Sequence, residues 1–315
     1  MSKATLRIVF FGTSDFAVPA LKYLIQNGYN FSAVVTQAEK PAGRLRVTMP
    51  SPIKKAALES HILVLEPHNL KNDEEFFKHF KHLNPDLCIV AAYGKIIPSR
   101  YLEVPKHGFL NIHPSLLPKY RGPSPVQAAI LNGDKETWVS VILIDERMDH
   151  GPVLANIKYQ ISSSKSFTEI NKEIWEIGAG FMIQILQKWI SGEIKPKPQN
   201  ENQASYCKLL ARIDGKIAWD KSAQEIYNQI RALNPEPGTW TKWKGMILNI
   251  KRVELLNKET LEDKPGMVIN INNNIAVATR KCYLILKQIQ LEGGKEMDAK
   301  SFINGHSDFL GSVLE

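Results

Sequence analysis

The chain has 315 residues, of which 43% are hydrophobic and 23% are charged. This balance is typical of globular proteins, and the length favours two domains over one. The apolar runs are far shorter than the roughly 20 residues of a membrane span, so we expect no membrane partner. The net charge of +8 fits a polyanionic partner such as a nucleic acid, but many enzymes carry as much.

The cysteines Cys88, Cys207 and Cys282 are odd in number and far apart, and the sequence contains no CxxC pair. This pattern supports neither a disulfide framework nor a zinc site, and it favours reduced thiols. The chain reaches an apolar strand at Leu6, which leaves no room for a transit peptide. We therefore expect a cytoplasmic protein, in a bacterial cytosol rather than an organelle.

The first 190 residues alternate continuous apolar runs with amphipathic patterns. The apolar runs predict buried strands over residues 6–11, 31–36, 85–92, 108–113 and 138–144. The amphipathic patterns predict helices over residues 17–25, 53–60, 73–82, 126–131 and 168–190. This alternation is typical of a Rossmann-like, doubly wound α/β domain, which we place at residues 1–190.

The composition changes after this domain. Residues 191–205 are polar, contain two prolines and lack apolar periodicity, so we place a linker at residues 191–208. The patterns beyond it predict a strand over 213–219, a helix over 223–233 and short strands over 246–253, 266–271, 275–279 and 283–289. These elements predict a smaller, mostly β domain at residues 209–315, arranged as a barrel.

One predicted strand ends in two polar side chains, Asn111 and His113. Residues two apart in a strand point to the same face, and Pro114 ends the strand directly after the histidine. Ligands of open α/β sheets bind at the carboxyl ends of the strands. The residues alone leave both a structural and a catalytic role open for His113.

Asp149 lies in a turn after another apolar strand. A turn aspartate commonly caps its own loop, but this carboxylate is also a candidate to orient His113 and to favour its charged form. The sequence does not decide between these two roles.

Three loops differ in what they indicate. The loop that begins at Gly12 has a single glycine, so it lacks a dinucleotide fingerprint. Residues 115–125 contain three prolines and form a stiff loop after His113. Residues 40–52 are basic and longer than an ordinary strand–helix connection. This third loop suits phosphate binding, although a solvated surface loop would look the same.

Several of these segments together resemble a known superfamily. Residues 111–113 (NIH), 115–122 (SLLPKYRG) and 148–152 (MDHGP) resemble the folate-dependent formyltransferases. Further segments narrow the resemblance to the family that formylates methionyl-tRNA, over essentially the whole chain. They are FGTSDFA (11–17), EKPAGR (39–44), MPSPIK (49–54), PDLCIVAAYGKIIP (85–98), IDGKIAWD (213–220) and RALNPEPGTW (231–240).

The resemblance implies transfer of a formyl group from 10-formyltetrahydrofolate, as co-substrate, to initiator methionyl-tRNA for translation initiation. It implies Asn111, His113 and Asp149 as catalytic residues, an oligonucleotide-binding (OB-like) barrel that contacts tRNA, and a monomer. We expect no metal, because the sequence has no ligand-spaced cluster of histidine and cysteine.

The implied folate site consists of the strand end and loop at 90–97 and of the stiff loop. Its residues are Val90, Ala91, Ala92, Tyr93, Gly94, Ile96, Ile97, Ser115, Leu116, Leu117 and Pro118. The implied tRNA contacts are Arg44, Arg46, Lys54 and Lys55. The family usually continues with glycine and lysine after Arg44, but this chain reads LRVT at 45–48. His150 stands where the family has a small residue or threonine, and we expect it to be peripheral.

Two rival interpretations remain at this point. The same chemistry could serve a small acceptor, such as a sugar nucleotide or glycinamide ribonucleotide, and salt-sensitive tRNA binding would argue against that. The chain could also be a nucleic-acid-binding module whose α/β domain is catalytically dead. An Asn111→Ala variant with unchanged activity would favour that second interpretation.

Overall fold

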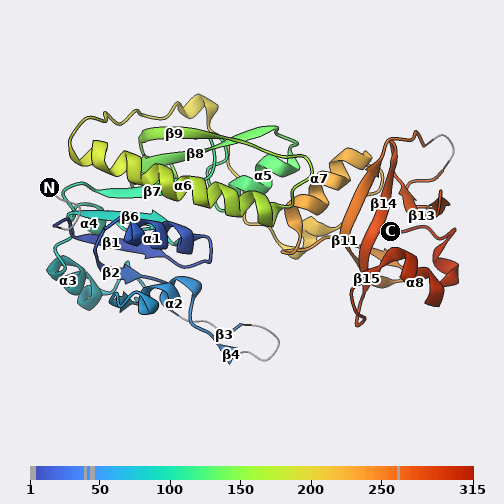
Figure 1. Cartoon of the computed structure of the whole chain (residues 1–315), viewed down its shortest axis with the longest axis horizontal. Coiled ribbons are helices and arrows are strands. Elements are labelled where there is room, and N and C mark those ends of the chain that lie inside the picture. The colour runs from blue at the N-terminus through green and yellow to red at the C-terminus, as the bar shows by residue number, and fades with distance from the viewer. Residues whose placement is uncertain (1–4, 39–40, 43–46, 261–262) are drawn as a thin grey trace. The chain divides into compact units, whose positions relative to one another are not determined.

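The computed structural model describes residues 5–38, 41–42, 47–260 and 263–315, which divide into two compact units (Figure 1). The first unit comprises Met1–Pro125, Glu136–Gln160 and Asn171–Cys207, and the second Val126–Lys135, Ile161–Ile170 and Lys208–Glu315. The domain boundaries at residues 190 and 208 stay a prediction. Within the described part, no helix is both long and apolar enough to cross a membrane.

The first unit is built on a seven-stranded sheet in the order β5-β2-β1-β6-β7-β8-β9. Its first five strands are parallel, whereas β8 and β9 are antiparallel to their neighbours. The strands are β1 (Ile8–Gly12), β2 (Phe31–Val35), β5 (Val64–Leu65), β6 (Leu87–Ala91), β7 (Phe109–His113), β8 (Glu136–Leu143) and β9 (Val153–Gln160). A separate antiparallel pair joins β3 (Pro41–Ala42) and β4 (Val47–Thr48).

Helices cover both faces of this sheet, as a doubly wound domain requires. They are α1 (Ala17–Gln26), α2 (Pro52–Glu59), α3 (Glu74–His82), α4 (Ser99–Leu102) and α6 (Phe167–Ile190). On one face, Phe80 of α3 packs against Phe11 and Phe109, with ring centroids 6.0 and 6.2 Å apart. On the other face, α6 approaches β7 so closely that a Cβ on Gly178 would lie 2.9 Å from Ile112. The Rossmann-like expectation is confirmed.

The second unit contains an antiparallel sheet in the order β10-β11-β14-β13-β12, with β15 beside β14. Its strands are β10 (Trp240–Trp243), β11 (Met246–Leu256), β12 (Val268–Ile271), β13 (Asn274–Ala278), β14 (Tyr283–Leu291) and β15 (Met297–Asp298). The C-terminal residues connect its two edges, because Val268 N donates to Ser312 O and Lys242 and Glu315 exchange backbone bonds. The sheet is thereby curled into the small barrel that the sequence predicted.

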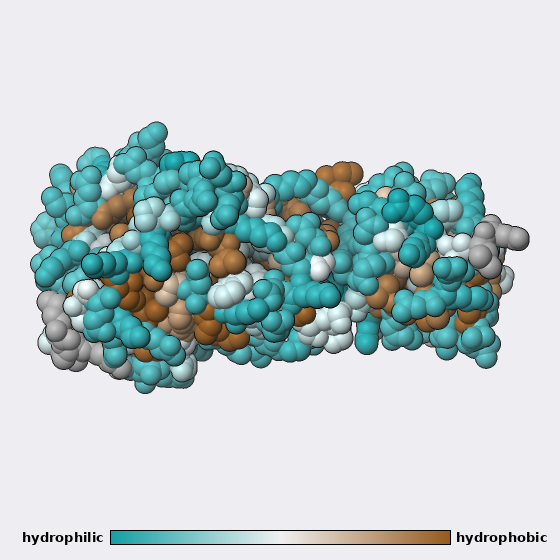
Figure 2. Space-filling model, turned by 90° about the horizontal axis from the view of Figure 1, so that it is seen from above, coloured by the Kyte–Doolittle hydropathy of each residue, from teal (hydrophilic) through white to brown (hydrophobic). Residues whose placement is uncertain are grey.

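Three helices belong wholly or mainly to this unit, namely α5 (Pro125–Leu131), α7 (Ala223–Leu233) and α8 (Ala299–Gly305). The Ser222 hydroxyl and the Glu225 carboxylate form a capping box that begins α7 where the sequence predicted it. The barrel core contains Trp243, Phe302 and Phe309, whose rings meet edge to face at 5.1–5.6 Å. On the face in Figure 2, hydrophobic residues form several patches among hydrophilic ones.

The predicted strand over 213–219 is wrong. Residues Arg212–Gly215 form a 3-10 turn, which an isolated bridge between Lys216 and Trp240 follows. The Asp214 carboxylate accepts a hydrogen bond from Ala211 N (2.8 Å), which closes the turn locally. Gly215 has no room for a side chain, because a Cβ there would lie 1.8 Å from Gly238 O.

Candidate active site

His113 is the last residue of β7 and is almost completely buried. Its Nε2 lies 3.0 Å from Tyr120 O in the stiff loop that follows. A carbonyl oxygen only accepts hydrogen bonds, so Nε2 is the donor and carries a proton. This contact fixes the ring and directs Nδ1 to the opposite side.

Asp149 faces that opposite side of the imidazole. Its Oδ1 lies 3.6 Å from His113 Nδ1, and its Oδ2 accepts a hydrogen bond from Gly122 N at 2.8 Å. The carboxylate therefore contacts the loop after β7 rather than capping its own turn. The first distance is longer than a direct hydrogen bond, so the carboxylate faces the ring without bonding to it directly.

Asn111 lies on the same face of β7 as His113 and is half-buried. Among the residues that the structure describes, no hydrogen bond involves its side-chain amide. Asn111 thus offers free N–H donors at the strand end where His113 and Asp149 meet. A free donor can stabilise negative charge on a reacting oxygen, and a buried imidazole with a carboxylate beside it can bind or take up protons there.

The stiff loop is held by its own hydrogen bonds. Ser115 Oγ donates to Lys119 O (2.6 Å), and Ser140 Oγ on β8 donates to Ser115 O and accepts from Leu117 N. Of the loop residues expected at the folate site, Leu116 is exposed, Pro118 is half-buried, and Ser115 and Leu117 are buried. The loop therefore presents only part of its predicted surface to a ligand.

The other predicted folate segment leaves the carboxyl end of β6. Val90 and Ala91 belong to the strand, while Ala92 and Gly94 have positive φ angles of 45° and 73°. The carbonyls of Ala92 and Tyr93 are held by Thr13, and Tyr93 O also accepts from Gln37 Nε2 (2.6 Å). Burial raises the pKa of the Tyr93 hydroxyl. The segment is thus a fixed backbone platform at the sheet edge.

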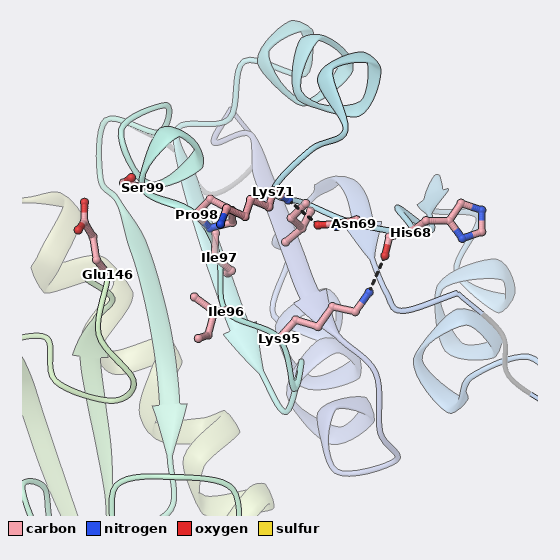
Figure 3. Close-up of a pocket in the computed structure, with 10 residues that line it drawn as sticks. His68, Asn69, Lys71, Lys95, Ile96, Ile97, Pro98, Ser99 and Glu146 are labelled. Carbon is pink, nitrogen blue, oxygen red and sulfur yellow. Dashed lines mark hydrogen bonds between the residues drawn. The ribbon is translucent and has the colours of Figure 1, made fainter.

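A cleft of about 710 Å³ opens beside this platform (Figure 3). Ile96 and Ile97 of the predicted folate residues line it, together with His68, Asn69, Leu70, Lys71, Lys95, Pro98, Ser99 and Glu146. Ile96 is 65% exposed, and Lys95 Nζ donates to His68 O across the cleft (3.3 Å). The cleft combines an apolar floor with two lysines, so it suits a ligand that has both an apolar and an anionic part.

The predicted tRNA contacts differ among themselves. Lys55 on α2 is exposed, whereas Lys54 is half-buried and pairs with Glu66 at 2.7 Å. Arg44 and Arg46 lie outside the described residues. Lys55 is therefore the described member of this set whose side chain is most open to a phosphate.

Sequence reasoning missed three residues that support Asp149, namely Arg121, Gln199 and Glu201. Arg121 is completely buried, and its guanidinium contacts Gln199 Oε1 (2.8 Å) and Glu201 Oε1 (2.6 Å). Hydrogen bonds from Arg121 lower the pKa of Glu201 to about 2. No local pattern signals these contacts, because Gln199 stands in a polar, proline-containing stretch that resembles a linker.

His150 binds Asp145 (Nδ1–Oδ2, 2.5 Å) and faces Glu201 at 3.4 Å. Its ring is thus held between two carboxylates, those of Asp145 and Glu201. Among the described residues, no group of three or more histidines, cysteines and acidic residues is arranged to hold a metal ion.

The chain matches the formyl transferase family over residues 6–186 and the C-terminal domain of formyl transferases over residues 210–307. It is 38% identical over 310 residues to the methionyl-tRNA formyltransferase of Caldicellulosiruptor saccharolyticus, covering 98% of this chain and 99% of the relative. It is 42% identical over 316 residues to that of Methylacidiphilum infernorum, covering 98% of each. The chain therefore belongs to the methionyl-tRNA formyltransferase family.

Solved structures share the fold. The N-formyltransferase of Helicobacter canadensis, solved with folinic acid and dTDP-3-aminofucose, has a TM-score of 0.68 at 19% identity, covering 93% of this chain and 100% of that one. HypX of Aquifex aeolicus, solved with tetrahydrofolic acid, has a TM-score of 0.66 at 18% identity and covers 98% of this chain. This chain spans about half (48%) of that HypX chain.

Proposed function

We propose that this chain transfers the formyl group of 10-formyltetrahydrofolate to the α-amino group of methionine on initiator methionyl-tRNA, as a monomer in the bacterial cytosol. The observation that carries the proposal is the group at the end of β7. There the free amide of Asn111 lies on the same face as a buried His113, whose Nδ1 is 3.6 Å from Asp149. Family membership and the relatives' names support the donor and acceptor.

The folate supplies a formyl group bonded to N10. In the reaction the α-amine forms a bond to the formyl carbon, negative charge develops on the formyl oxygen, and the C–N10 bond then breaks. Asn111 is the direct donor to that oxygen, because its amide makes no hydrogen bond among the described residues. Preorganised donors of this kind typically contribute about 10²–10³ in rate.

His113 acts beside Asn111 by holding the site together. Its Nε2 proton is committed to Tyr120 O and its Nδ1 faces Asp149, so the ring keeps the loop and the carboxylate next to the reacting centre. Asp149 accepts the proton that the attacking amine loses, through a water molecule. The same water passes that proton to N10 as the C–N10 bond breaks, so the proton that the amine loses ends on the leaving nitrogen.

The two substrates would occupy different surfaces. The platform at 90–97 and the adjoining cleft supply apolar contacts and two lysines for the folate, whose glutamate end is anionic. The tRNA carries one charge per nucleotide, so basic side chains such as Lys55, Lys54, Arg44 and Arg46 would dominate its affinity. We therefore propose that tRNA binding weakens steeply with salt concentration.

The test is the transfer of labelled formyl from 10-formyltetrahydrofolate to methionyl-tRNA, with uncharged tRNA and free methionine as controls. We expect label on the charged tRNA alone, and a His113→Ala variant should lose about 10²–10⁴ in kcat. Label transferred without charged tRNA would keep the chemistry and reject the acceptor. A protein that binds tRNA and transfers no label would be the catalytically dead module.

A further inference from the structure

The segment at residues 197–207, which we call the return segment, runs back from the end of α6 to the loop of Asp149. Gln199 Nε2 donates to both Asp149 O (2.8 Å) and Gly151 O (2.7 Å). Asp149 itself has a φ of 50°, in the left-handed region that residues with a side chain adopt at a cost. The two hydrogen bonds hold the backbone on both sides of His150 and so maintain this conformation.

Arg121 fixes the orientation of the Gln199 amide. Its Nε and Nη2 donate to Gln199 Oε1 at 3.1 and 2.8 Å, while Nη2 also pairs with Glu201 Oε1 at 2.6 Å. A guanidinium has donors and no acceptor, so the amide oxygen must face Arg121 and the amide nitrogen must face the two carbonyls. The guanidinium is completely buried, so the side of the Gln199 amide that faces Arg121 meets N–H donors.

The same segment also holds the loop after β7. Arg121 N donates to Ser205 O and Cys207 N donates to Arg121 O, both at 2.8 Å. The fit is close, because a Cβ on Gly122 would lie 2.4 Å from Cys207 O. Arg121 stands between the residue whose carbonyl binds His113 Nε2 and the residue whose N–H binds Asp149 Oδ2. The return segment therefore holds the short stretch of loop that binds both His113 and Asp149.

We propose that Gln199 is a positioning residue for formyl transfer, which holds the Asp149 carboxylate against His113 through the two backbone carbonyls. This inference rests on the proposed function, because it assigns Asp149 and His113 to the reaction. It gives the polar stretch after α6 a role in catalysis in addition to its role as a connection.

The test compares Gln199→Glu with the wild-type full-length enzyme. The glutamate keeps an acceptor for Arg121 but replaces the two N–H donors with an oxygen that repels the carbonyls of Asp149 and Gly151. We expect kcat to fall about 100-fold with the KM of both substrates unchanged, because a shift of about 1 Å in a positioned group has that effect. The pH at half-maximal kcat should also shift, which loss of folded protein alone would not cause.

Gln199→Asn is the second variant, since it keeps the amide and shortens its reach, and it should show the same change in kcat and pH profile. Gln160→Glu is the matched control, because Gln160 is an exposed glutamine at the end of β9 whose amide donates to Glu136 at 3.4 Å. It should retain wild-type rates. A folded Gln199→Glu or Gln199→Asn variant with wild-type kcat would overturn this inference alone, whereas a wild-type enzyme without transfer would overturn the proposed function.

Discussion

In the α/β unit, β7 ends in Asn111 and His113, polar side chains that are half-buried and buried beside a carboxylate. In the C-terminal unit, the central strands β11 and β14 direct apolar side chains such as Leu248 and Ile289 into a closed core. The first arrangement places polar side chains at a strand end, and the second fills a core with apolar ones. The contrast teaches that the two sheets use their strands differently. The first presents polar side chains at the strand end where we propose the reaction, and the second buries apolar side chains that stabilise its own unit.

A third location refines this contrast. Asp86 lies just before β6, at the amino end of the sheet, and its carboxylate accepts three hydrogen bonds from Arg7. At the carboxyl end, the side-chain amide of Asn111 makes no hydrogen bond within the described residues. Polar groups at the two ends of one sheet are therefore placed differently, paired within the protein at the amino end and left open to the proposed substrate at the carboxyl end.

The largest effect that we expect is on stability, from Phe302→Ala in the barrel core. Phe302 is 2% exposed and contacts Trp243 and Phe309, so its truncation should lower the free energy of unfolding by about 3–5 kcal/mol. Denaturant unfolding measures this loss, and kcat per folded molecule should stay unchanged. Met297→Ala, at an exposed site on β15, is the control and should change stability little. Equal losses in both variants would contradict the assignment of Phe302 to the core.

Asn111→Ala should lower activity and leave stability unchanged. The rate of formyl transfer should fall by about 10²–10³, because a donor to the developing oxyanion is lost. The thermal midpoint should not fall, since the amide forms no hydrogen bond among the described residues. Asn111→Asp, which keeps the shape and adds negative charge, should lose at least as much activity. Unchanged transfer in both variants would remove Asn111 from the mechanism.

Asp86→Asn should give the smallest effect and a distinctive pH dependence. The side-chain hydrogen bond from Arg7 lowers the pKa of Asp86 below its usual value. A lowered folded-state pKa stabilises the protein above the unfolded pKa of about 3.9, and this contribution is lost as the pH falls through the folded value. The variant should thus be about 1 kcal/mol less stable at pH 7, and the difference should shrink below about pH 4. A difference that is constant from pH 7 to pH 3 would contradict the ion pair.

Much of the fold could be predicted because buried strands give strong local signals. The continuous apolar runs that became β1, β6 and β7 are buried at nearly every position. By contrast, β9 alternates mostly exposed and half-buried residues at the edge of its sheet, and the sequence analysis did not predict it. The segment at 213–219 carries an apolar pattern, yet the Asp214 turn and the close contact at Gly215 exclude a strand there.

For the site, the sequence by itself determined that Asn111 and His113 share a face at a strand end, because side chains alternate with a period of two. It also determined the family, through motifs that extend over both units. Only the tertiary structure decided that Asp149 faces His113 and that Gln199 and Arg121 support it. Arg121 and Gln199 are separated by 78 positions. Contacts between residues so far apart in the sequence depend on where the chain returns to the sheet, and local sequence periodicity does not predict that position.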